Sequence, residues 1–377
     1  MRWLPLSALA GVLVATWASP CVAMDDPDEP AAGTLVRFFT GSDHVTVRSL
    51  VGDYTFDGPR DLSLSIHYNN ERVTIPAIAA PVGSAEAVDA ITTASRPIAG
   101  NAYQDFSKVR NEFQGELTHG HFGADYYVSS ESDYLGQEVS ASYNRDLEGQ
   151  QLNLAFGTSY GWDAIDPVAD DDTHTGNSTK TTLHWDAVAT RVVTPTAMVR
   201  VGVEYNVVDG LQHNPYRNVY AGGTNVPERH PDHRARRDAF VKFNQYLRNR
   251  SSLKLTYRYY NDDWGIGSHE IGSRLSQYIT HGVFAQYQYR YYTQTAADFY
   301  RAVYATTAGV NGYLTGDYRM AALSSHLFGI ALDFDLGTMA AESAWLHRLR
   351  ARMSYDRYFN SNNYSANILE TGVDFRF

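Results

Sequence analysis

The chain has 377 residues, a formal net charge of −11 and one cysteine. Aromatic residues make up 13% of it, and 27 of them are tyrosines. This negative charge argues against a nucleic-acid partner, whose phosphates would be repelled. The cysteine, Cys21, lies in the leader described next. The rest of the chain therefore has no thiol, which excludes disulfides, thiolate metal sites and cysteine nucleophiles there.

The first residues have the pattern of a secretory signal. Arg2 supplies a positive charge, an apolar stretch runs from Trp3 to Trp17, and small residues precede Met24. We predict a signal peptide at 1–23, a short lead at 24–32 and export of the rest. Lipid attachment is disfavoured, because Pro20 stands where a small residue is needed before Cys21.

The remaining chain is predicted to cross a membrane with strands. It has no run of about 18 apolar residues, the length that a spanning helix needs. Without such helices, backbone hydrogen bonds inside a membrane must close between strands. The sequence alternates accordingly, as in the stretch from Val199 to Tyr205, where Val201 and Val203 flank Gly202. This period of two indicates strands with one apolar and one polar face.

Segments of this kind predict an all-β fold, a single antiparallel transmembrane barrel over 33–377. Sixteen strands are expected, or fourteen if the first pair lies outside the barrel. The expected ranges are 33–40, 44–57, 61–75, 103–117, 121–131, 134–147, 151–163, 178–193, 196–209, 234–248, 251–263, 268–279, 282–293, 317–335, 345–359 and 366–377.

The connections sort into two classes by length. Alternate turns are tight, such as 57–60 and 194–195, whereas the others include the long connections 76–102, 164–177, 210–233 and 294–316. Barrels of this kind place short turns in the periplasm and long loops outside. The connection 336–344 is longer than its class predicts.

Charged residues occupy the positions that alternate with the apolar face. An Arg or Lys facing lipid at the midplane costs about 2 to 4 kcal/mol, so these residues are expected to line the lumen. They are Arg200, Glu204, Lys242, Arg258, Glu270, Arg274, Arg290, Arg348, Arg350, Arg352, Glu370 and Asp374. The triplet Arg348, Arg350 and Arg352 is expected on one strand. It is either a basic ladder for an anion or part of a salt-bridge network with Glu370 and Asp374.

Tyrosines and tryptophans gather near the expected strand ends. Such rings prefer the membrane–water interface, and we interpret them as aromatic girdles. They are Trp162, Tyr259, Tyr260, Trp264, Tyr291, Tyr292 and Trp345.

The long-loop mouth gathers most of the other unusual residues. His230, Asp232 and His233 are weak candidates for a divalent metal site. The alternative is a structural role, in which Arg and Asp side chains bond each other and hold the loop together. Asp262 and Asp263 are expected in a hairpin turn, with a calcium site as the alternative. The residues expected at this extracellular mouth are Arg217, Arg234, Asp262, Asp263 and Asp298.

No catalytic residue and no cofactor is predicted. Ser268 with His269, and Ser325 with His326, are adjacent in sequence, and neighbouring residues of a strand point to opposite faces. The nucleophile motif G-x-S-x-G is absent from the sequence. We expect that the protein is not an enzyme.

Several motifs resemble an outer-membrane family of unknown function, DUF3570. They run in the expected order across nearly the whole predicted mature chain. The similar segments are Asp89 to Ser95, Glu131 to Tyr134, Asn214 to Arg217, Arg229 to Arg234, Tyr257 to Ile266 and Gln294 to Tyr300. The resemblance implies an outer-membrane barrel without an assigned activity. Members are often encoded beside a small lipoprotein, a thioredoxin-like protein and a flavin transferase, which implies a periplasmic lipoprotein or redox partner.

Three functions remain open from the sequence. The first is a pore or conduit for a small polar solute in contact with outer-membrane lipid. The second is a plugged barrel that serves as an outer-membrane platform for a lipoprotein or redox complex. The third is an outer-membrane hydrolase.

Overall fold

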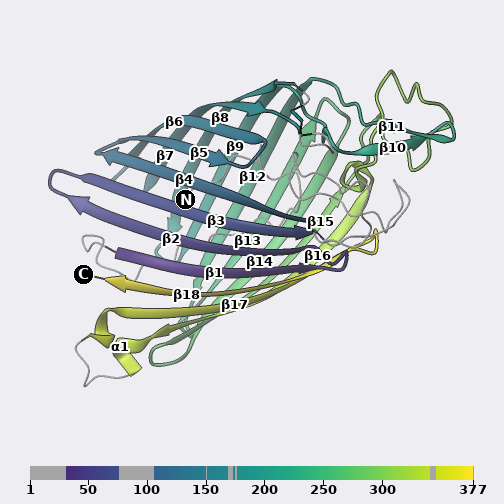
Figure 1. Cartoon of the computed structure of the whole chain (residues 1–377). Coiled ribbons are helices and arrows are strands. Elements are labelled where there is room, and N and C mark those ends of the chain that lie inside the picture. Colours follow the sequence, from purple (N-terminus) through teal and green to yellow (C-terminus); the bar gives the residue numbers. More distant parts are fainter. Residues whose placement is uncertain are drawn as a thin grey trace.

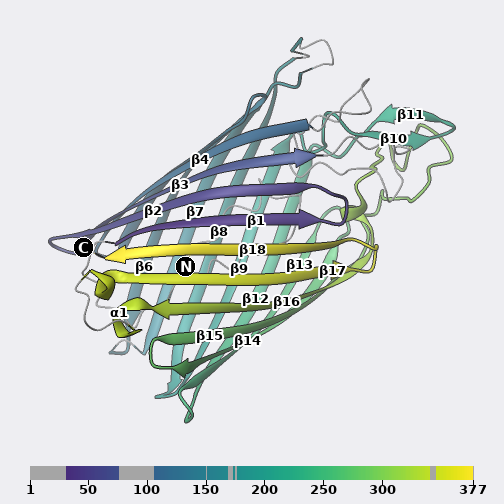
Figure 2. The same ribbon diagram turned by 60° about the horizontal axis from the view of Figure 1, so that its bottom comes forward.

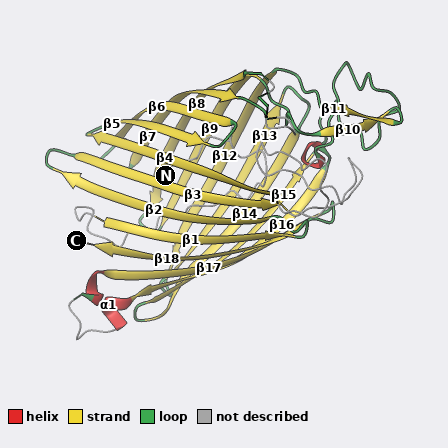
Figure 3. Ribbon diagram, viewed as in Figure 1, coloured by secondary structure: helices red, strands yellow, loops and turns green. Residues whose placement is uncertain are grey.

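A computed structural model of the chain describes residues 31–75, 106–149, 151–168, 173–174, 176–339 and 345–376. Sixteen of its strands form one closed antiparallel barrel (Figures 1 and 3). They are β1 (Ala31–Gly41), β2 (Thr46–Gly58), β3 (Leu62–Ile75), β4 (Phe106–His119), β5 (Phe122–Ser130), β6 (Tyr134–Leu147), β7 (Leu152–Ile165), β8 (Ser178–Thr194), β9 (Ala197–Gly210), β12 (His233–Leu247), β13 (Ser251–Asp262), β14 (Gly267–Thr280), β15 (Val283–Gln294), β16 (Leu323–Asp335), β17 (Leu349–Asn360) and β18 (Ser365–Arg376).

The barrel is an up-and-down ring in which neighbours along the chain pair with each other. The one interruption lies between β9 and β12, which pair directly because β10 (Asn218–Ala221) and β11 (Thr224–Pro227) form a separate hairpin. The ring closes where β1 pairs with β18. Closure leaves no strand edge among the barrel strands, which is the condition for placing a sheet in a lipid bilayer.

The two faces of the wall differ in chemistry, as the alternation predicts. On β9 the side chains of Val201 and Val203 are 46% and 57% exposed on the outer face. Glu204 points the other way, and its side chain is only 8% exposed. The outer face of the barrel is therefore apolar, and the inner face carries the charged residues.

The two ends of the barrel are also different. At the short-turn end, tight turns use left-handed backbone, for example at Glu148 and Gly149. At the long-loop end, the connections between β9 and β12 and between β15 and β16 form a folded mass beyond the strands (Figures 1 and 2). None of the helices that the structure describes is long and apolar enough to span a membrane.

The prediction of sixteen strands is confirmed, but two strands are shorter than expected. The range 317–322 contains the 3-10 helix η1 (Tyr318–Met320), and β16 begins only at Leu323. Before β17, the connection from 336 carries the helices α1 (Leu336–Met339) and η2 (Leu346–Arg348). In both places the predicted strand begins too early, because apolar residues that precede the strand belong to a compact turn.

Some sequence predictions lie outside the described residues or shift slightly. β1 begins at Ala31, two residues before the expected 33. The predicted signal peptide at 1–23, most of the lead at 24–32 and the long connection 76–102 lie outside the described residues.

We predict that an arginine is tolerated on one face of β6 and not on the other. Val139 lies on the outer face and is 44% exposed, whereas the hydroxyl of its neighbour Ser140 bonds the carboxylate of Asp125 inside the barrel. Val139→Arg should lower the free energy of unfolding by about 2 to 4 kcal/mol, because the cation would face hydrocarbon. Denaturant titration in lipid vesicles measures this loss.

The matched control is Ser140→Arg, at nearly the same depth but beside Asp125. It should cost clearly less than the outer-face variant, because its guanidinium meets a carboxylate. Equal losses for the two variants would contradict the assignment of the faces.

Candidate functional site

The interior wall near the long-loop end carries a dense ion-pair network on β3 and β4 and the β5–β6 turn. The guanidinium of Arg110 bonds Glu71 and lies 3.7 Å from Glu112. The Lys108 ammonium lies 2.7 Å from Glu131 and also bonds Asp133. All these charges are largely buried and each lies beside a group of opposite sign, so they hold this part of the wall together. The alternation of β4 could have located Lys108 and Arg110, which the sequence analysis did not single out.

A second network lies on the opposite part of the wall. The Arg258 guanidinium lies 2.8 Å from Glu204 and 3.4 Å from Asp238, on three neighbouring strands. Arg290 lies 3.7 Å from Glu270. The predicted lumen residues Arg258, Arg290 and Glu204 thus lie inside the barrel, as paired charges.

The predicted arginine ladder is only partly correct. Arg348 ends the 3-10 helix η2 and is exposed, because β17 begins one residue later. Arg350 is the register partner of Asp374, and Arg352 lies 3.7 Å from Asp333. Glu370 instead bonds Arg37 at 2.6 Å. The two remaining arginines therefore belong to an acidic neighbourhood, which favours the salt-bridge interpretation over the free ladder.

The long loops fold into one body, which we call the cap: residues 211–232, 263–266 and 295–322. Its two long segments join through backbone bonds, as Arg229 and Leu314 exchange N–H to O=C bonds of 3.0 and 2.9 Å. A small apolar core forms around Val219, Tyr304 and Leu314. The cap is therefore a packed structure and not a set of independent loops.

Glu228 lies at the centre of the cap, with its side chain fully buried. Its carboxylate accepts hydrogen bonds from the backbone N–H of Gly316 at 3.1 Å and from the Thr315 hydroxyl. Arg217 and His230 lie 3.6 and 3.3 Å from it. Burial alone would raise the pKa of Glu228, but His230 and Arg217 outweigh it and lower the pKa to about 2.

A series of contacts connects the cap to two separate turns at the mouth of the barrel. At one side, the Tyr216 hydroxyl donates to Asp133 in the β5–β6 turn. The next residue, Arg217, lies 3.1 Å from Asp317, and the Tyr318 ring packs against Tyr364 in the β17–β18 turn. Six barrel strands separate these two turns on one side of the ring and ten on the other. The contacts thus cross the opening, and we call them the cap bridge.

The acidic turn between β13 and β14 is structural. Asp262 accepts N–H bonds from Trp264 and Ile266 at 3.0 and 2.9 Å, and it bonds the Arg234 guanidinium. Gly265 has φ +85°, and a side chain there would collide with Asp298. The turn interpretation therefore holds at Asp262, and Arg234, Asp263 and Asp298 lie around the same turn at the long-loop end.

The girdle interpretation is wrong for Trp264. Its ring is 4% exposed inside the cap, and the Arg234 guanidinium lies 4.1 Å from its centroid. It packs with Ile266, Phe299 and Met320 in a buried cluster. The position of an aromatic residue near a strand end does not distinguish a ring at the membrane interface from a ring that a loop covers. Both kinds of residue follow the same alternating segment in the sequence.

The candidate metal ligands do not converge. His230 is buried beside Glu228, whereas the ring of His233 is exposed and lies 2.7 Å from Asp209. Within the described ranges, no three His, Cys, Asp or Glu side chains form a group that could hold a metal ion. The sequence proximity of His230, Asp232 and His233 is therefore not matched by their geometry.

The serine–histidine neighbours also separate. Ser268 and Ser325 are buried on the interior face. His269 bonds Tyr257 at 2.9 Å and His326 bonds Tyr289 at 3.0 Å, in both cases on the outer face. Neither pair is placed to transfer a proton between its members.

We predict that acid loosens the cap before it unfolds the barrel. Because the pKa of Glu228 falls from 4.5 to about 2 on folding, its charged form stabilises the cap above pH 4.5. That contribution, about 3 kcal/mol, is lost as the pH falls through the range between these values. Trp264 fluorescence, isolated by subtraction of a Trp264→Phe variant, should shift to the red over this range while the strand circular dichroism signal stays constant.

The control is Glu228→Gln, which removes the titrating group. Its fluorescence should already be shifted at neutral pH and change less on acidification. A wild-type spectrum that stays constant down to pH 2 would show that Glu228 does not hold the cap.

Comparison with known proteins adds a family but no activity. No curated protein matches the chain. Among solved structures, OmpT of Vibrio cholerae gives a TM-score of 0.45 at 9% identity, covering 93% of this chain and 97% of that one. A bacterial polysaccharide outer membrane secretin gives 0.48 at 8% identity, covering 94% and 100%. The ferric enterobactin receptor PfeA of Pseudomonas aeruginosa, in mutant form, gives 0.45 at 9% identity and covers 88% of this chain, which spans only 53% of that receptor.

Scores at this level give no basis for transferring an activity. The family model described as "Protein of unknown function (DUF3570)" matches residues 84–363, more than half of the chain. The chain is therefore a closed β-barrel that belongs to the DUF3570 family.

Proposed function

We propose that the barrel is a pore for small polar solutes, with the cap controlling access at its long-loop mouth. The observation that supports this function most is the ring of sixteen strands with a charged inner face. A barrel of eight strands is filled by its own side chains, whereas one of sixteen is wide enough to leave an aqueous channel. Charged groups inside such a channel are hydrated at low cost and select the solutes that enter.

The cap bridge supplies the control in this proposal. It crosses the mouth through a few specific contacts, from Asp133 to Tyr216 and from Arg217 to Asp317. A hydrogen bond to a charged group contributes about 1.5 to 3 kcal/mol. Release of the contact between Tyr216 and Asp133, which leaves the cap itself folded, would therefore be accessible to thermal motion and would uncover the lumen.

The test is single-channel conductance of the purified protein in a planar bilayer, and the variant is Tyr216→Phe. It removes the hydroxyl that bonds Asp133, so the ratio of open to closed time should rise about tenfold or more. Folding is checked by heat-modifiable gel mobility. The matched control is Tyr220→Phe in β10 of the same loop, whose ring is exposed and should leave gating unchanged.

A second candidate function is a closed platform for a periplasmic lipoprotein or redox partner. The cap bridge also favours this platform function, because a barrel whose mouth stays covered by the cap would not conduct solutes. Folded wild-type and Tyr216→Phe proteins that both remain silent in the bilayer would contradict the pore. Affinity capture with the barrel as bait, followed by identification of a bound lipoprotein, would then support the platform.

A further inference from the structure

Two arginines point outwards from the barrel wall near its long-loop end. Arg48 is the third residue of β2 and Arg72 is the fourth from the end of β3, and both are exposed. Their chain neighbours Ser49 and Glu71 are buried on the inner side, where the Ser49 hydroxyl donates to the Glu71 carboxylate at 3.4 Å. Because side chains alternate along a strand, Arg48 and Arg72 lie on the outer face.

The two arginines face each other across β2 and β3, and we call them the arginine pair. Arg48 and Arg72 are register partners, in a row that continues with Phe38 on β1 and Val109 on β4. Side chains opposite each other on neighbouring strands have Cβ atoms within about 5.5 Å, and like charges in this position destabilise a sheet. The outward positions that the structure describes on β1 to β4 hold no Asp or Glu, so no carboxylate on these strands offsets the repulsion.

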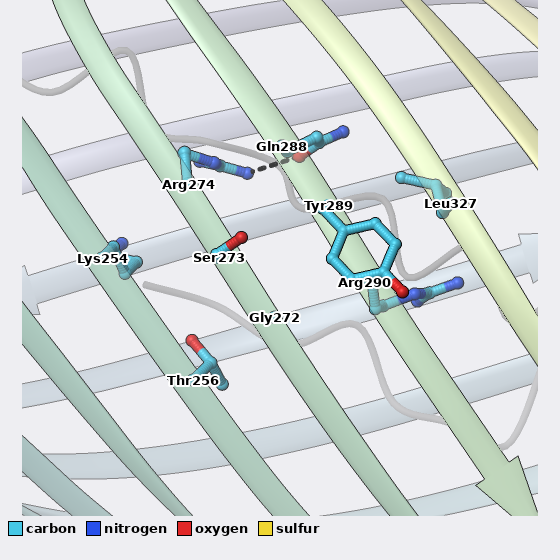
Figure 4. Close-up of a pocket in the computed structure, with 9 residues that line it drawn as sticks. All are labelled: Lys254, Thr256, Gly272, Ser273, Arg274, Gln288, Tyr289, Arg290 and Leu327. Atoms are coloured by element: carbon cyan, nitrogen blue, oxygen red, sulfur yellow. Dashed lines mark hydrogen bonds between the residues drawn. The ribbon is translucent and has the colours of Figure 1, made fainter.

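Other arginines of the barrel have partners on neighbouring strands. On the inner face, Figure 4 shows Arg274 on β14 beside Gln288 on β15, whose amide oxygen accepts its hydrogen bond at 3.0 Å. On the outer face near the long-loop end, Arg357 donates to Asn367 and Ser365 at 2.9 and 3.1 Å. Within the described part of the chain, the arginine pair makes no hydrogen bond, ion pair or ring contact. Its two guanidiniums are therefore available to a ligand.

The depth of the arginine pair suits the boundary between hydrocarbon and water. At about 3.3 Å per residue, Arg48 and Arg72 lie about 7 and 10 Å along the strand from the ends of β2 and β3, and strand tilt reduces this depth. The next outward row towards the loops carries hydroxyls, and the next row towards the middle of the barrel carries apolar and amide side chains. These rows are Thr40, Thr46, Thr74 and Ser107, and Val36, Leu50, Asn70 and Asn111. The pair thus lies where a lipid headgroup meets its acyl chains.

We propose that the arginine pair binds the phosphate of an anionic lipid in the leaflet at the long-loop end. A guanidinium binds phosphate through two parallel N–H to O bonds, and a phosphate between the two arginines would remove their mutual repulsion. Phe38 and Leu50, which are 43% and 52% exposed on the same face, would contact the acyl chains. Because this surface faces lipid and not the lumen, the proposal does not depend on whether the barrel conducts.

The first test measures lipid binding to the detergent-solubilised barrel by native mass spectrometry. The probe is lipid A, which carries two phosphates, and the reference is phosphatidylcholine, which has no net charge. The variant Arg48→Gln with Arg72→Gln should raise the dissociation constant for lipid A about tenfold or more, because two charge-assisted contacts are lost. Its binding of phosphatidylcholine should not change.

The matched control is Arg145→Gln with Arg191→Gln, which removes two outward charges from the short-turn end of the barrel. These two arginines are not register partners, and Arg191 already lies 3.2 Å from Glu148. The control should therefore change lipid A binding much less. Equal losses for the two variants would overturn the proposal, because they would reflect only the net charge of the protein.

The second test separates a lipid from a free anion by thermal unfolding in a neutral detergent. Lipid A should raise the unfolding midpoint of the wild type but not that of the Arg48→Gln, Arg72→Gln variant. Without lipid A, the variant should be at least as stable as the wild type, because it no longer has two facing cations. A wild-type midpoint that lipid A does not raise would overturn the proposal. Inorganic phosphate that raises the midpoint as much at equal ionic strength would also overturn it, since the pair would then be a site for free anions.

Discussion

Every other feature of this protein depends on the closure of the sheet by β1 and β18. A backbone N–H or C=O that meets hydrocarbon without a partner costs several kilocalories per mole, so a sheet in a bilayer must have no free edge. Eleven residues of β1, Ala31 to Gly41, align with residues of β18. The seam is also fixed by side chains, because Arg37 bonds Glu370 at 2.6 Å across 333 residues of sequence. Because the sheet is closed, every strand has one face towards the outside of the barrel and one towards the inside. Closure therefore separates the lipid-facing surface from the lumen.

The lumen then combines two kinds of charge arrangement. Near the long loops, Lys108 and Arg110 are matched by surrounding carboxylates, which rigidifies the wall where the cap docks. Nearer the short turns, cationic residues face each other across neighbouring strands, as Lys254 faces Arg274. The two arrangements thus occupy different depths of one wall. A count of charged residues on the inner face would not separate them, because the distinction depends on which residues face each other across strands.

The strands were predictable and the pairing of their charges was not. Alternation is a local property of a strand, so the ranges around Val203 or Tyr287 already show which residues face outwards. Register is different, because it joins residues that are distant in sequence: Lys254 meets Arg274, and Arg37 meets Glu370. The ladder of Arg348, Arg350 and Arg352 failed for a related reason, since an irregular turn replaces the first residues of the expected strand. In the cap, where no period exists, the sequence identified Arg217 as unusual but not Glu228, the buried carboxylate that joins Arg217 to the other long loop.

The position of Glu228 also bears on how the loops change over evolution. Its carboxylate is satisfied partly by residues of its own loop, such as Arg217, and partly by Thr315 and Gly316 of the other long loop. A buried carboxylate that loses its donors is strongly destabilising, so neither loop can lose its part of this contact without a compensating change in the other. Surface loops generally vary more among homologues than the strands that they connect. In this family we expect these two loops to co-vary, so that exchange between relatives succeeds only when both are transferred together.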